Sequence, residues 1–252
     1  MKIAAFCLAL LCLAASASAQ DSPENFHLEA GVMLWRPSPD IVITSGTLGT
    51  PVDFVNTFAV DDKFLADVRL VLKPARKHKL RFSMTPIRYE STQTLTQTIR
   101  FRGQTYAVGV PTTATLKWTL VRAGYEWDPI VTESGFAGLF FDLKYNKMNA
   151  ELTAPLVTQT YERRFPVPTV GGIWRGYFTK NFAITAEFTG LKFDHGDLNA
   201  KFYDLDLYGT ANFGRHTGVQ FGYRSVTVEY DSDTDTGDLK VKGPYIGAVV
   251  RF

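Results

Sequence analysis

Apolar and polar residues alternate along most of this chain, and no other feature of the sequence constrains its fold as much. Tyr203, Leu205 and Leu207, for example, fall on one side of an extended chain, while Asp204 and Asp206 fall on the other. A period of two residues is typical of strands with one apolar face. Comparable segments recur as far as the C-terminus, and segments with a helical period are scarce. The pattern therefore predicts an all-β protein.

The alternating segments divide into ten expected strands, and the links between them alternate in length. The longer links are expected at residues 37–59, 91–112, 149–166, 194–199 and 231–238, and the short ones at 74–77, 128–134, 179–181 and 214–215. Transmembrane barrels have short periplasmic turns, long outer loops and an even strand number, which leaves both termini in the periplasm. The sequence thus predicts a closed, antiparallel, up-and-down transmembrane β-barrel of about ten strands, with eight or twelve as alternatives.

Two local features refine this prediction. The apolar side changes phase at Pro86 and again near Ser225, and the missing backbone donor of the proline predicts a β-bulge at the first of these positions. Between them, the segment from Thr94 to Val110 is expected to form the tip of a long hairpin that turns at residues 102–104 and stands beyond the membrane.

The N-terminus predicts export. Lys2 precedes a short apolar run at residues 3–13, and Ala17 and Ala19 form the small-x-small pattern that signal peptidase reads. We therefore expect residues 1–19 to be a cleaved signal peptide and residues 20–252 to form one barrel domain. No later stretch has the length of an apolar transmembrane helix.

The composition of the expected mature chain excludes some partners. Both cysteines, Cys7 and Cys12, lie in the signal peptide, so the mature chain would carry no thiol or disulfide. Loss of Lys2 leaves 26 of the 27 Lys and Arg residues against 25 acids, a net charge of +1. Such a balance gives no reason to expect nucleic acid as a partner.

The last strand, which ends on Phe252, completes a resemblance. A signal peptide, alternating strands, links sorted by length and a C-terminal phenylalanine resemble the bacterial outer-membrane β-barrel proteins of the small OmpA/OmpW-like kind. The resemblance implies a bacterial outer-membrane location, with membrane lipid and lipopolysaccharide as surroundings. It also implies recognition by the barrel-assembly machinery and periplasmic chaperones through a terminal signal comprising Ile246, Ala248, Val250 and Phe252. Small members of this kind usually have eight strands, so ten would be a departure.

If the apolar faces point to lipid, the polar faces must point into the barrel. The residues expected to line the lumen are Asp67, Arg69, Arg81, Lys117, Arg122, Asp142, Lys144, Arg175, Glu187, Asp204, Asp206 and Arg224, with Glu29 and Arg88 beside them. Side chains fill barrels of about eight strands, whereas open channels appear at about 16. A plug of paired charges is therefore favoured over a narrow pore whose selectivity these charges would set.

We predict no catalytic, metal or cofactor site. Asp194 could orient His195 as a general base at an outer strand end, but the following Gly196 and Asp197 are ordinary turn residues. The acids between 231 and 238 could offer oxygen ligands to calcium. Lys242 stands where a calcium loop has its glutamate, however, so a solvated loop tip is favoured.

The expected function is that of a non-enzymatic barrel, either a structural envelope protein or a narrow small-solute channel with a charged lumen. One alternative is a surface binding protein or adhesin that uses residues 94–110 and 37–59, because exposed loops on a rigid scaffold often carry recognition. A rim hydrolase that acts on lipid or peptide through His195 is the other.

Overall fold

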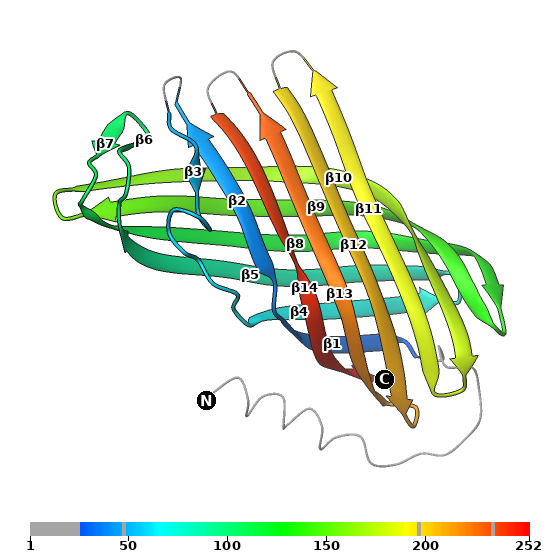
Figure 1. The fold of residues 1–252 in the computed structure, drawn as a ribbon. Coiled ribbons are helices and arrows are strands. Elements are labelled where there is room, and N and C mark those ends of the chain that lie inside the picture. The colour runs from blue at the N-terminus through cyan, green and yellow to red at the C-terminus, as the bar shows by residue number, and fades with distance from the viewer. Residues whose placement is uncertain (1–25, 47–48, 196–197, 233–234) are drawn as a thin grey trace.

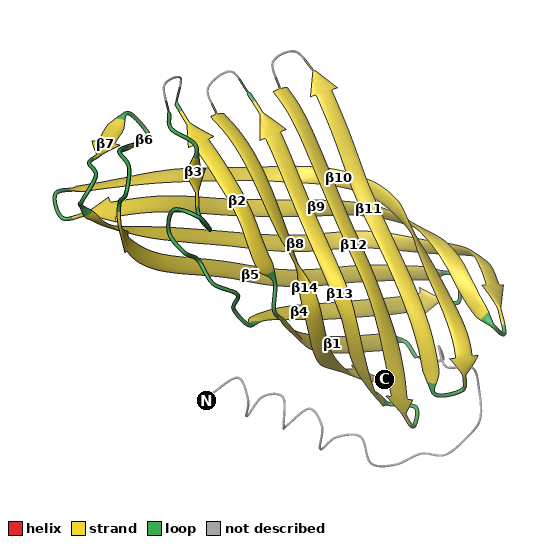
Figure 2. Cartoon of the chain, viewed as in Figure 1, coloured by secondary structure: helices red, strands yellow, loops and turns green. Residues whose placement is uncertain are grey.

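In the part of the chain that the computed structural model describes, every regular element is a strand (Figure 2). The model describes residues 26–46, 49–195, 198–232 and 235–252. The strands are β1 (Leu28–Trp35), β2 (Ser38–Ser45), β3 (Val52–Asp53), β4 (Leu65–Ala75), β5 (His78–Thr94), β6 (Ile99–Phe101), β7 (Gln104–Tyr106), β8 (Pro111–Thr132), β9 (Gly135–Ala154), β10 (Val157–Thr179), β11 (Phe182–His195), β12 (Leu198–Phe213), β13 (Thr217–Asp231) and β14 (Asp235–Arg251). The described residues include no helix long and apolar enough to cross a membrane.

Ten of these strands close into a ring in the order β1-β4-β5-β8-β9-β10-β11-β12-β13-β14, and β14 pairs back onto β1. All the pairs are antiparallel, so the predicted ten-stranded up-and-down barrel is confirmed. The long β14 pairs with β1 near one end and with β2 near the other, because the chain breaks at residues 36–37 and then continues along the same strand. The small strands β6 and β7 form a separate hairpin.

The two ends of the barrel differ. The inner end, predicted to be periplasmic, holds short turns and the C-terminus, where the backbone N–H of His27 donates to the carbonyl oxygen of Phe252 at 2.7 Å. The opposite, outer end carries the longer hairpins (Figure 1). The prediction of a long link at residues 149–166 is wrong, because β9 and β10 stay paired up to Ala154 and Val157. Alternating residues keep one face of these strand extensions apolar, so they remain strand well past the length needed to cross a bilayer.

The changes of apolar phase have a different cause from the predicted bulge. The β5–β8 ladder runs past Pro86 without a register shift, and the β12–β13 and β13–β14 ladders run past Ser225 in the same way. Instead, the apolar side moves from the outer to the inner face of an unbroken strand. On β5, Phe82 faces outward, whereas Ile87 is buried inside.

Outward-facing apolar side chains form a band around the inner half of the barrel. They include Leu34, Val68, Phe82, Val121, Phe141, Leu143, Val170, Trp174, Leu205, Leu207, Phe221 and Ile246, each at least 37% exposed. A continuous exposed band of this kind is what a transmembrane barrel presents to lipid. Trp127, Tyr145 and Tyr203 point outward, as aromatic residues at a membrane interface do, but Trp35 and Tyr89 are buried inside.

Beyond this band the strands form two facing sheets, β5-β8-β9-β10 and β11-β12-β13-β14-β2, around an apolar core. Outward positions there are polar, and Trp118, Met148, Leu152, Val228, Leu239 and Val241 point inward. The inversion follows from the change of surroundings, since water replaces lipid outside the strands and apolar residues then gain from burial inside.

The β6–β7 hairpin folds onto this core. Phe101 and Tyr106 are buried, and the Tyr106 hydroxyl donates to the carbonyl oxygen of Leu152 at 2.9 Å. Its turn is where it was predicted, with positive φ at Arg102 and Gly103, as a tight two-residue turn requires. The hairpin therefore packs against the barrel rather than standing free of it.

Candidate functional site: the barrel interior

The inner half of the barrel encloses a network of charged side chains from strands on all sides. Six cations and seven acids are linked by ion pairs: Arg69, Lys79, Arg81, Arg122, Lys144 and Arg224 with Asp67, Glu126, Asp128, Asp142, Glu187, Asp204 and Asp206. Arg175 adds a seventh buried cation and donates to Thr210 Oγ1 at 3.2 Å. Within this set the charges balance.

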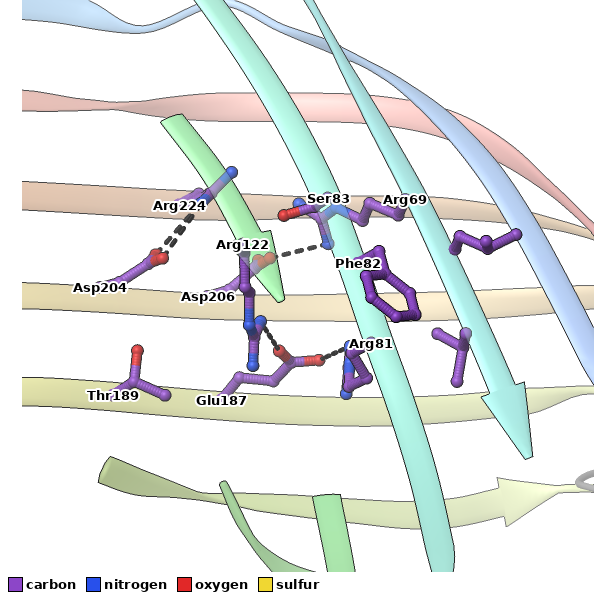
Figure 3. A pocket seen from close by; sticks show the side chains of 12 residues that line it. Arg69, Arg81, Phe82, Ser83, Arg122, Glu187, Thr189, Asp204, Asp206 and Arg224 are labelled. Carbon is purple, nitrogen blue, oxygen red and sulfur yellow. Dashed lines mark hydrogen bonds and ion pairs between the residues drawn. The ribbon is translucent and has the colours of Figure 1, made fainter. Parts of the chain in front are cut away.

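Glu187 on β11 lies at the centre of one part of the network (Figure 3). Its Oε1 accepts from Arg81 Nη2 at 2.6 Å and from the Tyr208 hydroxyl at 2.8 Å, and its Oε2 lies 3.4 Å from Arg122 Nη1. Arg81 also reaches Glu126 Oε2 at 2.8 Å. These contacts join strands that lie across the interior from one another, which are β5, β8, β11 and β12.

Arg224 on β13 organises the other part. Its Nε and Nη2 donate to the two carboxylate oxygens of Asp204, and its Nη1 donates to Asp67 Oδ2 at 3.3 Å. Lys144, which is fully buried, donates to Asp204 Oδ2 at 2.7 Å. A buried charge is tolerated only where it is paired and hydrogen-bonded, and these contacts meet that condition.

The network leaves little free space. A cavity of about 30 Å³ lies among Arg69, Arg81, Arg122, Glu187 and Asp206. That volume holds only one or two waters. Above it, Trp35 separates the charges from the apolar core, with the Arg224 guanidinium 5.5 Å from its ring centroid and its Nε1 donating to the carbonyl oxygen of Gly243.

The structure brings eleven of the twelve expected lumen residues into the interior. Lys117 is the exception: it lies on the outward face of β8 and is exposed, and Arg88 likewise faces outward on β5. Both lie beyond the apolar band, where the outer face is the polar one, so the assumption that every polar face points inward fails there. Lys79, Glu126 and Asp128 belong to the network but were missed, although their positions on alternating strands could have identified them.

Neither of the two loop regions considered in the sequence, around His195 and at residues 231–238, forms a functional site among the described residues. His195 pairs with Leu198 at the end of β11, and the adjoining residues 196–197 lie outside the described residues. Residues 233–234 of the acidic segment also lie outside them, and Asp238 is exposed on β14. In the described ranges, no cluster of three or more His, Cys, Asp or Glu side chains has the arrangement of a metal site.

Asp235, in the same acidic segment, instead joins the two outer sheets. Its Oδ2 accepts from Arg163 Nη2 on β10 at 2.7 Å, and its Oδ1 accepts from the Ser45 hydroxyl and the Gly46 N–H. This part of β14 lies beyond the apolar band. Burial alone would raise the pKa of Asp235, but the hydrogen bonds from Arg163, Ser45 and Gly46 outweigh it and hold the pKa below its ordinary value.

The residues expected to form the assembly signal lie on β14 and just after it. Ile246, Ala248 and Phe252 are exposed on the outer face, and Val250 lies on the same face but is buried between Thr217 and Ala30 of the neighbouring strands.

Comparison with known proteins identifies the fold. No protein-family model and no curated protein matches the chain. Among solved structures, the outer-membrane protease OmpT from Escherichia coli matches with a TM-score of 0.64 and 8% identity, covering 94% of this chain and 100% of OmpT. The translocator domain of the autotransporter NalP from Neisseria meningitidis matches with a TM-score of 0.48 and 9% identity, covering 100% of this chain and 95% of the other.

The attachment protein Ail from Yersinia pestis gives a TM-score of 0.38 and 12% identity over 90% of this chain and 99% of its own. At such low identity the likeness to OmpT establishes architecture and not activity. The chain therefore has the fold of the bacterial outer-membrane β-barrel proteins.

Proposed function

We propose that the chain is a closed, non-enzymatic structural protein of the bacterial outer membrane. The observation that carries this proposal is the packing along the axis of the barrel: the ion network occupies the inner half, and an apolar core packs above it. A solute would have to displace both. The buried β6–β7 hairpin adds to the closure at the outer end.

The narrow-channel alternative has less support. A conducting pore needs a continuous wet path, whereas the cavity at the ion network is about 30 Å³ and the layer above it is apolar. The adhesin alternative also loses support, because Ile99, Phe101 and Tyr106 of the hairpin are buried and not displayed. No hydrolytic role is proposed for His195.

Planar-bilayer conductance of the refolded protein tests the proposal. We expect no current steps from the wild type, and none from a variant in which residues 96–109 are replaced by two glycines, because the ion network would still seal the barrel. Steps in the wild type would overturn the proposal, and steps in the variant alone would identify a gated channel instead. Heat-modifiable gel migration verifies that each protein is folded before its current is recorded.

A further inference from the structure

The wall of the barrel has a window between β10 and β11. The two strands are paired from the inner end up to Val170 and Gly190, and among their described residues no pairing extends beyond that point. β10 then continues along β9 and β11 continues along β12, so the strands diverge toward the outer end (Figure 1). At the far side of the gap, Arg163 meets Asp235, and the hydroxyls of Tyr161 and Tyr230 lie 3.4 Å apart. The opening is thus bounded at both ends.

Two prolines make β10 suitable as a strand whose edge is unpaired. Pro166 and Pro168 lie two residues apart, so the backbone donors that they lack fall on the same side of the strand. In the register of the paired part, Pro168 would face Lys192, yet the two do not pair. The neighbouring β9–β10 ladder is continuous from Val157 to Gly176. The sequence therefore keeps this edge from closing.

Behind the window lies a cavity of about 530 Å³. Its walls are mainly apolar, and they include Phe165, Val167, Leu191, Phe193, Phe202 and Val228. A cavity of this size falls in the range that binds small organic ligands, and an apolar lining favours a hydrocarbon group. Phe193 belongs to the inward series of β11 and lines the cavity, yet it is 44% exposed.

Basic residues surround the barrel at the level of this window. Where the ten ring strands leave the apolar band, the first outward-facing position beyond it is Lys or Arg on seven of them, and β4, which begins at Leu65, has no basic residue there. These residues, which we call the basic collar, are Arg36, Arg88, Lys147, Arg164, Lys192, Lys201 and Lys242, and the other two positions hold Thr119 and Ser225.

The part of the collar on β9 to β12 is unbroken, and Arg164 and Lys201 also line the cavity. Arg164 pairs with Glu162 at 2.5 Å and Lys201 pairs with Glu229 at 2.7 Å, but these ion pairs are on the surface. Exposed pairs of this kind contribute little free energy, so both cations can turn to a phosphate.

From the window, the cavity and the collar, we infer that this site binds a phosphorylated lipid of the outer leaflet, with one acyl chain inserted between β10 and β11 and the phosphate held by Arg164 and Lys201. The apolar band ends at Pro166, so the entrance lies at the boundary between acyl chains and headgroups. An anionic headgroup is complementary to the collar, whereas an uncharged ligand would leave it unused. This inference rests on the proposed outer-membrane location but not on whether the lumen conducts.

Photolabelling tests the site. The probe is phosphatidic acid with a diazirine in one acyl chain, incorporated into phosphatidylcholine nanodiscs that contain the refolded protein. We expect labelled peptides to be concentrated at residues 165–168 and 191–193 rather than spread around the band. Val167→Trp, which fills the cavity, should lower labelling there by about tenfold or more, since the acyl chain loses its apolar site. Val170→Trp places the same side chain on the outward face of the same strand and should leave labelling unchanged.

Two further arms examine the headgroup and guard against misfolding. Arg164→Gln with Lys201→Gln should weaken labelling severalfold, whereas Lys242→Gln, in the collar but away from the window, should not. Phe193→Glu supplies a second way to block the entrance if Val167→Trp does not give a heat-modifiable barrel.

Three results would each overturn the inference. The first is uniform labelling around the apolar band, and the second is equal labelling by a diacylglycerol probe, which has no phosphate. The third is displacement of the lipid by inorganic phosphate while Val167→Trp has no effect on labelling. Cross-links between two copies of the chain through these residues would overturn it as well. Conductance is recorded in a separate experiment, so a negative photolabelling result does not bear on the proposal that the barrel is closed.

Discussion

Arg224 forms a bidentate ion pair with Asp204 inside the barrel, with Nε 3.1 Å from Oδ1 and Nη2 3.0 Å from Oδ2. The same guanidinium also reaches Asp67, so one side chain neutralises acids on β4 and β12. Pairs of this kind tie strands on different sides of the barrel interior to one another.

The first prediction concerns this pair. Arg224→Leu should destabilise the barrel by about 3–5 kcal/mol, because two buried acids lose their shared partner. Urea unfolding in lipid vesicles, followed by heat-modifiable migration, measures the change. Arg215→Leu, the same substitution at an exposed turn, is the matched control. Arg224→Lys, which keeps the positive charge, should cost less than Arg224→Leu, and an equal loss in the two variants would contradict the ion-pair explanation.

The second prediction concerns the hairpin. Phe101 is fully buried, and Phe101→Ala should cost about 3–5 kcal/mol of hairpin docking, as deletion of a buried aromatic ring usually does. The hairpin would then open, and trypsin should cleave after Arg100 or Arg102 faster than in the wild type. Val108→Ala, at a residue that is 58% exposed, should leave the cleavage rate almost unchanged. Equal cleavage in all three proteins would mean that the hairpin is not held by the core.

The third prediction is a pH dependence. The folded-state pKa of Asp235 lies below its ordinary value, so its contribution to stability is full above the ordinary pKa of about 3.8 and is lost as the pH falls through the depressed value. The wild type should therefore be more stable than Asp235→Asn at pH 7, and the difference should shrink below about pH 4. Asp231→Asn, at an exposed position near the same tip, is the control. A difference between wild type and Asp235→Asn that grows with acid would have the wrong sign.

The fourth prediction concerns assembly. If the side chain of Phe252 belongs to a signal read by the assembly machinery, Phe252→Ala should reduce the folded barrel in cell envelopes severalfold while leaving refolding of the purified chain in detergent unchanged, because the backbone hydrogen bonds to His27 and Leu28 remain. Phe213→Ala removes another exposed outward phenylalanine near the inner end and should affect neither measurement. Equal loss in cells and in detergent would instead assign Phe252 a purely structural role.

Period-two alternation was sufficient to predict the architecture. The segment at residues 203–207 defines a strand and its two faces, with Tyr203, Leu205 and Leu207 on one side and Asp204 and Asp206 on the other. Ten such segments, joined by alternating long and short links, predict the closed ring that the structure contains. Most of the buried charges followed from the same reasoning, because a lipid-facing band forces the opposite face inward. These features are local, and a strand's side-chain period is set by the backbone alone.

The assignment of each face depended on the tertiary structure. The pattern of alternation is the same whether the apolar side of a strand meets lipid or a protein core. The change of phase between Phe82, which faces outward, and Ile87, which faces inward, therefore predicted a bulge at Pro86, although its cause is a change of surroundings. The wrong prediction that Lys117 and Arg88 face the lumen has the same cause. The window between β10 and β11 was also hidden, because Pro166 and Pro168 mark an unpaired edge only once the neighbouring strands are known. The sequence by itself determined the strands and their two faces; only the tertiary structure decided which solvent each face meets, because burial depends on partners far apart in the chain.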